Sequence, residues 1–252
     1  GEMTDIAPIT PGKYHLYLSV YDDNGNYKSN DELEVCVFEI TKAGVRIDRV
    51  STVFDIEYED TAQISGQIMG SGEEEAAMPT GTVTAMLYDR ESNTCVAIIK
   101  TELENGSFKI IQNEQVAADR EYQFGLVYSG DDNYKQGAAT SNPFKINKKK
   151  VTFDVSGTEQ LYAPGEEKKI SVKGSNTKLL SDDAITVKYY KVDENEDKLV
   201  STVPSAKTIA AGRYLYVISI DGAEKENYEP ANEYIVNSLN IPDFNLYKNV
   251  GF

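Results

Sequence analysis

The feature of this sequence that most limits its fold is a segment that occurs three times. Each copy is a short run that begins with tyrosine and alternates apolar with polar residues. A turn rich in Asp, Gly and Asn follows, and then a second tyrosine. The leading tyrosines, Tyr14, Tyr122 and Tyr214, lie 108 (122 − 14) and 92 (214 − 122) residues apart. Because one β-sandwich domain takes about 100 residues, this spacing predicts one sandwich per copy.

The junctions between the copies repeat as well. Segment 38–48 matches segment 144–154, with Phe, Ile, Lys, Val and Asp at positions shifted by 106 residues (144 − 38). Each junction joins the last strand of one repeat to the first strand of the next with almost no Gly, Ser or Pro linker. Short joints of this kind favour consecutive domains that bend little relative to one another.

Apolar residues alternate with polar ones at the period of a β-strand along most segments, as in Val83, Ala85 and Leu87. One dry face and one wet face are typical of antiparallel sheets. Turn signals separate the runs, and no stretch has the 3.6-residue period of a long helix. Between positions 49 and 147 we expect about seven strands, which is the pattern of a sandwich. They are centred near Phe54, Ile64, Leu87, Ile98, Ile110, Leu126 and Ile146.

The predicted fold class is therefore all-β, with tandem immunoglobulin-like antiparallel β-sandwiches arranged end to end. Residues 45–148 and 149–241 are expected to form one sandwich each, and residues 242–252 a C-terminal tail. Residues 1–44 match only the terminal hairpin strands of a repeat. Because an isolated hairpin is marginal in water, we expect residues 1–44 to pack on the next domain, on sequence outside this chain or on another chain. Homotypic strand exchange is one such route.

The formal net charge of −16 argues against nucleic acid and anionic membranes as partners. The acidic runs 73–75 and 193–197 are expected to be solvated loops, with cation capture or a basic partner as the alternative. No run of about 18 apolar residues predicts a membrane span. The start shows no leader pattern, so we expect the chain to be cytosolic, already processed or excised. Cys36 and Cys95 fall in different repeats and are expected to be small buried residues.

Few residues suggest chemistry, and we expect no enzyme. His15 is the single histidine and lies in a predicted strand, which excludes the usual His-based triads and most zinc sites. Asp22, Asn24 and Asn26 alternate as the oxygen ligands of a calcium loop do. The twelfth position of that loop is Leu33 instead of a bidentate glutamate. A hairpin turn is therefore the alternative interpretation, and no other cofactor is predicted.

The tyrosines offer one candidate ligand contact and one structural role. Tyr189 and Tyr190 are adjacent in a predicted strand, so one of them must face outward and could contact a ligand. Tyr14, Tyr122 and Tyr214 each begin a penultimate strand. That is the position of a tyrosine corner, whose hydroxyl bonds nearby backbone. Stacking on sugar rings is the alternative role.

The middle repeat carries motifs of a known kind. A Pro-Thr-Gly-Thr-Val strand at 79–83, Tyr122, and the turn Tyr-Ser-Gly-Asp-Asp-Asn-Tyr at 128–134 resemble the tandem bacterial Ig-like repeats, particularly the group 3 type. The resemblance covers about 49–148 well and the two flanking regions more loosely. In the last repeat the turn departs at 219–228, and the Pro-Thr-Gly-Thr-Val element is absent.

The resemblance implies a non-catalytic structural or adhesive repeat module of a bacterial cell-surface or secreted protein, such as a stalk or an adhesin. Its location would be extracellular or on the cell surface, and its partner a host protein or a glycan. Two alternatives stay open. One is a carbohydrate-binding accessory module of a secreted enzyme, which the absence of Trp disfavours. The other is a fibre or pilus-like subunit that exchanges strands through residues 1–44.

Overall fold

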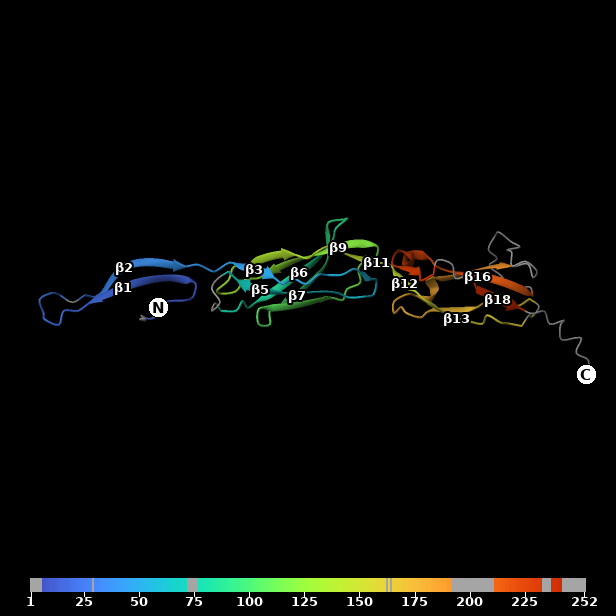
Figure 1. Ribbon diagram of the computed structural model, residues 1–252, viewed down its shortest axis with the longest axis horizontal. Helices are drawn as coiled ribbons and strands as arrows, with labels where there is room; N and C mark the ends of the chain where they lie inside the picture. The colour runs from blue at the N-terminus through green and yellow to red at the C-terminus, as the bar shows by residue number, and fades with distance from the viewer. Residues whose placement is uncertain are drawn as a thin grey trace, which may run out of the picture. The chain divides into compact units, whose positions relative to one another are not determined.

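The computed structural model describes residues 6–28, 30–71, 77–161, 163, 165–191, 211–232 and 237–241 (Figure 1). Nearly all of the regular structure in these ranges is β-strand. The helices among them are two 3-10 turns, η1 (Asp182–Ala184) and η2 (Gly222–Glu226). The prediction of an all-β fold without long helices is confirmed. Neither helical turn is long or apolar enough to cross a membrane.

The chain divides into two compact units by its internal contacts. Unit 1 comprises residues 1–54, 62–112 and 122–144. Unit 2 comprises residues 55–61, 113–121 and 145–252. The division assigns residues 55–61, 113–121 and 145–148 of the middle repeat to unit 2, so these units are not the sequence repeats.

The N-terminal part of unit 1 is a hairpin of two antiparallel strands, β1 (Gly12–Val20) and β2 (Asn30–Ile40). Gly12 lies opposite Ile40, and Tyr14 lies opposite Phe38. The rings of Tyr14 and Phe38 stack with centroids 5.6 Å apart. Since residues that lie opposite each other share a face of the sheet, this contact fixes which side of the hairpin is apolar.

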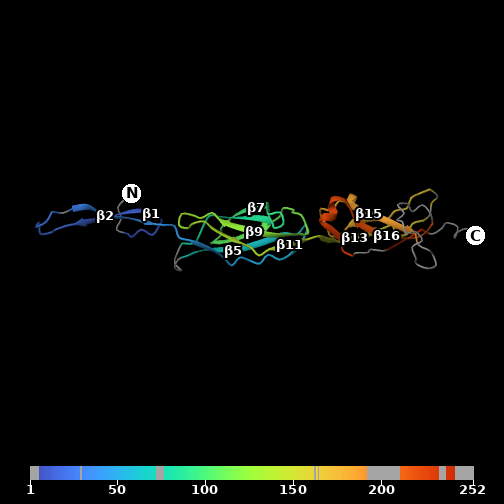
Figure 2. The same ribbon diagram turned by 90° about the horizontal axis from the view of Figure 1, so that it is seen from above.

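The middle of the chain forms two sheets (Figure 2). The smaller has the order β3 (Val45–Asp48), β5 (Ala62–Gly70), β8 (Ser107–Gln112). The larger has the order β4 (Ile56–Glu57), β11 (Phe144–Asn147), β9 (Arg120–Tyr128), β6 (Thr82–Asp89), β7 (Thr94–Glu102), and β10 (Gly137–Thr140) also pairs with β9. If β4 and β10 are left out, the first, second and fifth of the remaining strands form one sheet, and the third, fourth, sixth and seventh form the other. This is an immunoglobulin-like strand order.

Alternate residues of the middle strands are buried, as the sequence predicts. Val83, Ala85 and Leu87 of β6 have no exposed surface, nor do Phe124 and Leu126 of β9. Burying one such side chain stabilises the fold by roughly 1.5–3 kcal/mol. Two sheets that each bury one face over a shared core are the basis of a sandwich.

Two predictions about this region are wrong. Phe54 is exposed and precedes the strand, because its neighbour Val53 is the inward residue. The Asn142 side chain binds the N–H and C=O of Val53 at 2.9 and 2.7 Å, and so replaces a strand ladder there. Cys36 and Cys95 are exposed free thiols, not buried. Cys36 lies on the hairpin. Cys95 lies on β7, the edge strand of the larger sheet, beside the register shift between Leu87 and Tyr88 of β6.

The rest of unit 2 contains three small sheets. They are β12 (Lys149–Val151) with β17 (Tyr228–Pro230), β13 (Phe153–Ser156) with β14 (Ser171–Gly174), and β15 (Ile185–Lys191) with β16 (Gly212–Ile220) and β18 (Asn237–Ile241). One core cluster contains Ile170, Tyr189, Tyr214, Tyr216, Ile218 and Ile241. The strand predicted at 199–203, the tail 242–252 and the acidic runs 73–75 and 193–197 lie outside the described residues.

Candidate functional site

A junction residue and the second tyrosine of the following repeat meet in both units. In unit 1, Ala43 forms a parallel bridge with Tyr134, and its N–H donates to the Asn133 carbonyl at 2.9 Å. In unit 2, Lys149 pairs in parallel with Tyr228, and its N–H donates to the Asn227 carbonyl at 2.9 Å. The junction motif and the second-tyrosine motif, which lie apart in the sequence, are therefore paired through their backbones in both units.

The surroundings of Tyr228 contain an interior carboxylate, that of Glu59. Glu59 follows β4 in a tight turn, which the N–H of Asp60 closes on the Glu57 carbonyl at 3.0 Å. Its backbone has φ of 72°, in the left-handed region that a glutamate adopts at a cost. The turn conformation aims the side chain at residues far along the chain, and its side chain is only 6% exposed.

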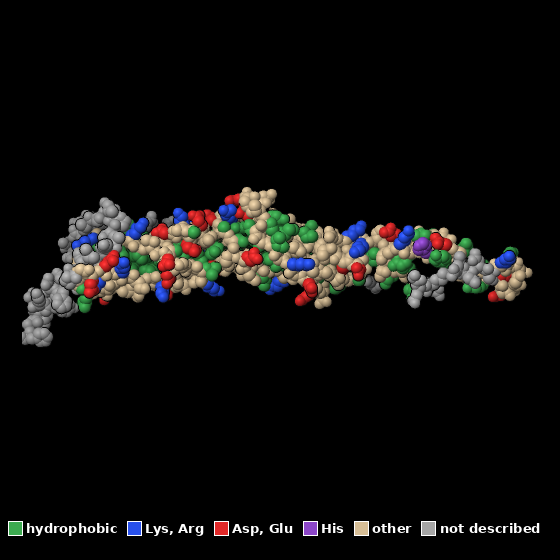
Figure 3. All heavy atoms as spheres, turned by 180° about the vertical axis from the view of Figure 1, so that it is seen from behind, with side chains coloured by type: hydrophobic (Ala, Val, Ile, Leu, Met, Phe, Trp, Pro, Cys, Tyr) green, Lys and Arg blue, Asp and Glu red, His purple; other side chains and the backbone are tan. Residues whose placement is uncertain are grey.

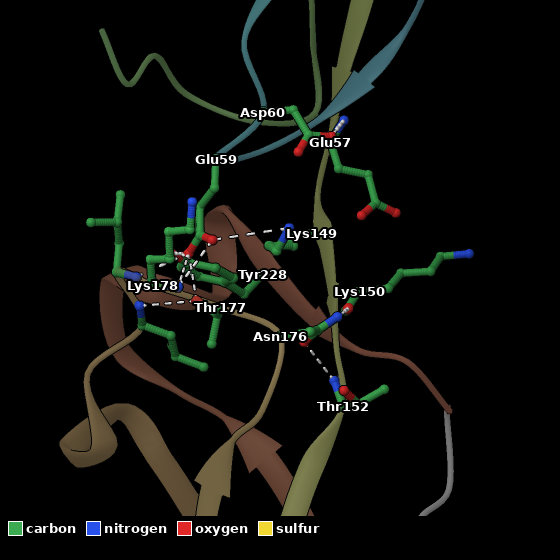
Figure 4. Close-up of polar contacts among 12 residues, drawn as sticks. Glu57, Glu59, Asp60, Lys149, Lys150, Thr152, Asn176, Thr177, Lys178 and Tyr228 are labelled. Carbon is green, nitrogen blue, oxygen red and sulfur yellow. Dashed lines mark hydrogen bonds and ion pairs between the residues drawn. The ribbon is translucent and has the colours of Figure 1, made fainter. Parts of the chain in front are cut away.

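Four hydrogen-bond donors and one cation surround the Glu59 carboxylate (Figure 4). The Tyr228 hydroxyl donates to it at 2.7 Å, and the Thr177 hydroxyl donates to the same oxygen. The N–H groups of Lys178 and Leu179 donate at 3.1 Å, and the Lys149 ammonium lies at 4.0 Å. Successive N–H groups that converge on an anion form a backbone nest.

The protonation states in this cluster follow from these contacts. Burial acts to raise the pKa of Glu59, but the hydrogen bonds from Thr177, Tyr228, Leu179 and Lys178 outweigh it, and the pKa falls below its ordinary value. Burial, together with the hydrogen bond to the Glu59 carboxylate, raises the pKa of Tyr228. At neutral pH the pair is therefore a carboxylate and a neutral phenol. Since both pKa values move away from neutrality, the pair suits anchoring and not proton transfer.

Unit 2 also has an open groove of about 420 Å³. Its lining mixes acidic, basic and amide side chains, namely Glu57, Asp119, Asn147, Lys148, Lys150 and Glu229. Interspersed charges of both signs give no strong field of one sign for a charged ligand. Among the described residues, no group of three or more His, Cys, Asp and Glu side chains could hold a metal ion.

The candidate calcium residues lie in the turn of the β1–β2 hairpin. One carboxylate oxygen of Asp22 accepts the N–H of Asn24 at 2.9 Å, and the other accepts the N–H of Tyr27 at 2.6 Å. These bonds lower the pKa of Asp22 and are those of an Asx turn. Calcium binding by Asp22, Asn24 and Asn26 stays a prediction.

Tyr189 and Tyr190 face opposite sides of β15. Tyr189 belongs to the core of unit 2, and its hydroxyl accepts the N–H of Ile170 at 3.0 Å. Burial raises the pKa of Tyr189. Tyr190 is half-buried and is the member of the pair that a ligand could reach, so its role as a ligand contact stays a prediction.

The three leading tyrosines occupy equivalent places. The Tyr14 hydroxyl donates to the Thr10 carbonyl at 2.7 Å, which is the contact that a tyrosine corner makes with upstream backbone. Tyr122 and Tyr214 are buried, and Tyr122 contacts the ring of Phe144. A shared structural role for the three stays a prediction.

Sequence reasoning missed the role of Glu59. Glu59 and Asp60 read as a polar turn between two strands, one acidic pair among 41 acidic residues. Nothing in the spacing of the acidic residues singled out Glu59 as an anchor for the second tyrosine of the last repeat. The sequence did not show that this anchor would come from Glu59, 169 residues before Tyr228.

Comparisons with known proteins assign no family to this chain and return similar solved structures at low TM-scores. No family model matches the sequence, and no curated protein matches it. Three similar solved structures are the fibronectin(III)-like modules of Clostridium thermocellum CbhA, the FN1–FN3 domains of chicken CNTN1, and a 3Ig structure of titin in an E-to-A mutated variant.

Identity to these three chains is low. The CbhA modules are 14% identical over 80% of this chain and 96% of theirs, with a TM-score of 0.24. The CNTN1 domains are 14% identical over 90% and 76%, with a TM-score of 0.25. The titin domains are 10% identical over 82% and 69%, with a TM-score of 0.29. The immunoglobulin-like assignment therefore rests on the strand order of the chain itself.

Proposed function

We propose that this chain is a non-catalytic structural or adhesive repeat module of a bacterial cell-surface or secreted protein. Its repeats would be a partial unit at 1–44 and sandwiches at 45–148 and 149–241, with a tail at 242–252. The proposal draws on the resemblance to tandem bacterial Ig-like repeats. It assigns no reactive role to any side chain.

One observation carries the proposal: the backbone pairing of Ala43 with Tyr134 recurs at Lys149 with Tyr228. A linker whose N–H and C=O groups are hydrogen-bonded in a fixed register has lost much of the freedom of a loop. Glu59 adds a charge-assisted anchor to the second pairing. The Glu59 carboxylate thus has a structural use: it fixes Tyr228 and the backbone N–H groups of Lys178 and Leu179. A module that keeps its neighbours at a set spacing needs such fixed joints.

The location is tested on cells of the organism that makes the protein. An antibody raised against the purified chain should label intact cells or appear with the secreted fraction. Protease treatment of intact cells should remove the cell-bound label. A signal confined to the cytoplasmic fraction would reject the surface role.

The structural role is tested by ligand panels against the purified chain. A purely structural spacer should show no shift of its melting temperature with any glycan or host protein on an array, whereas an adhesive module should show a shift with a host protein. A glycan that raises the melting temperature in wild type, and fails to do so in Tyr190→Ala, would replace the spacer by a carbohydrate-binding module.

A further inference from the structure

The β1–β2 hairpin carries core-type residues on an uncovered face. Leu16, Leu18 and Val20 alternate along β1 and are 45%, 49% and 52% exposed. Figure 3 shows His15, the purple group, which belongs to the opposite face of the hairpin. Single exposed apolar residues are ordinary. A row of them along one face of a strand marks a surface that another element is expected to cover.

The same positions are interior in the middle repeat. A shift of 108 residues places Leu16 and Leu18 on Phe124 and Leu126, which have no exposed surface. A shift of 106 residues places Phe38 of β2 on Phe144, which is buried. The ring pairs correspond too. The ring centroids of Tyr14 and Phe38 lie 5.6 Å apart, and those of Tyr122 and Phe144 lie 6.2 Å apart. The hairpin is therefore the equivalent of β9 with β11.

The other face of the hairpin is more polar, although it also carries Val37, which is 43% exposed. The Nδ1 atom of His15 lies 3.3 Å from the Glu34 carboxylate, and the Tyr17 hydroxyl donates to the same group at 3.2 Å. His15 and Tyr17 stack on this side. One polar face and one apolar face are what a sheet at the surface of a sandwich has.

We propose that the apolar face of the hairpin is the docking surface for the first half of its own repeat. The occupant is a set of antiparallel strands equivalent to β3, β5, β6 and β8, carried on the same polypeptide N-terminal to β1. In the middle repeat these strands precede β9, and β6 pairs along the edge of β9 from Val83 with Tyr128 to Asp89 with Tyr122. Within the described residues, β1 pairs with β2 alone, so its second edge is open to a partner strand.

A second copy of the chain fits this surface poorly. The half-sandwich that would complete the hairpin exists in the middle repeat, but there β6 already pairs with both β7 and β9. A strand with two neighbours has no free edge to offer. Strands linked in the same polypeptide also dock at a high effective concentration. This inference holds whether or not the protein lies on a cell surface.

The test compares this chain with a form extended N-terminally by its own polypeptide, long enough to supply the equivalent strands. Cys36 is the probe, because it lies opposite Leu16 on the apolar face and is a free, exposed thiol. Both forms carry Cys95→Ser. Maleimide labelling of Cys36 should slow by at least about tenfold in the extended form, since a buried thiol reacts only when the structure opens.

A matched pair of substitutions separates docking from general effects. Leu18 and Val37 are similarly exposed, at 49% and 43%, but Val37 lies opposite His15 on the polar face. In the extended form, Leu18→Asp should restore fast labelling of Cys36, and Val37→Asp should not. In the shorter form, neither substitution should change the labelling rate.

Two results would overturn the proposal. One is equal labelling of Cys36 in the two forms, with equal amide exchange along β1. The other is a mass that doubles with concentration for the shorter form, together with slow labelling, which would assign the surface to a second copy. A monomer with fast labelling that becomes protected in the extended form supports it.

Discussion

Tyr134 in unit 1 and Tyr228 in unit 2 hold equivalent positions and are anchored in different ways. Both close a turn, and both pair in parallel with a junction residue. The Tyr134 hydroxyl donates to a neutral acceptor, the Ala77 carbonyl. The Tyr228 hydroxyl donates to the Glu59 carboxylate. The comparison shows one backbone design stabilised by a backbone acceptor in one place and by a buried charge in the other.

The turns before the two tyrosines also differ in which segment supplies the carboxylate. In unit 1 the Asp131 carboxylate organises the turn, accepting the N–H groups of Asn133 and Tyr134 at 2.8 Å and that of Thr80 at 2.7 Å. In unit 2 the turn is the short helix η2, and the carboxylate that binds Tyr228, through its hydroxyl, is that of Glu59, which lies outside this turn. The carboxylate is thus internal to the turn in unit 1 and supplied by a separate segment in unit 2.

The largest effect is expected from Glu59→Ala. The substitution leaves the Tyr228 hydroxyl and two backbone N–H groups without their acceptor, and should lower the free energy of unfolding of unit 2 by about 2–3 kcal/mol. Urea unfolding followed by amide exchange in β12 and β17 measures it. Glu226→Ala, an exposed glutamate in η2, is the control and should change stability little. Equal effects of the two would show that the Glu59 cluster stabilises nothing.

The two tyrosine hydroxyls sharpen the comparison directly. Tyr228→Phe removes a bond to a charged acceptor and should cost about 2 kcal/mol, whereas Tyr134→Phe removes a bond to a neutral carbonyl and should cost about 1 kcal/mol. Both changes keep the ring and its packing. Denaturant midpoints of the two variants measure the difference, and a larger loss for Tyr134→Phe would reverse the comparison.

Asp131→Ala tests the internal carboxylate of unit 1. Because Asp131 is partly exposed, we expect a loss on the order of 1–2 kcal/mol. The loss should be confined to unit 1, with faster amide exchange at Asn133 and Tyr134. Asp22→Ala in the exposed hairpin turn is the matched control, and its unfolding midpoint should stay that of wild type. A loss of protection in unit 2 would contradict the assignment.

The smallest expected effect is the dependence of stability on pH. The folded pKa values of Glu59 and Asp131 lie below their ordinary values of 4.5 and 3.8. Each carboxylate therefore contributes stability that is full above its ordinary pKa and is lost as pH falls through its folded pKa. Between pH 5 and pH 3, wild type should lose more stability than Glu59→Gln. Parallel curves for the two proteins would show that Glu59 titrates alike in both states.

Much of the fold could be predicted because the alternation of apolar residues is local. Val83, Leu87 and Leu126 point inward as their spacing requires, and a residue's face in a strand follows from its position alone. The exposed Cys36 and Phe54 could not be predicted in this way. Their burial depends on what covers their face, and that is a property of other segments.

The candidate site was less predictable for the same reason. The repeat motifs at Ala43 and Lys149 and at Tyr134 and Tyr228 are visible in the sequence, but nothing in their spacing shows that they pair. Glu59 was invisible as an anchor, since its importance comes from donors that lie 118 to 169 residues away.

The sequence by itself determined that this protein is built of β-strands, that its pattern recurs about every hundred residues, and which residues of each strand face a core. It could do so because strand geometry has a fixed period of two. Only the tertiary structure decided that Glu59 becomes the anchor of Tyr228 and that, within the described residues, the Leu16 face of the hairpin stays exposed. Both depend on which distant segments come together, and a buried charge is stable only where such segments bring it donors.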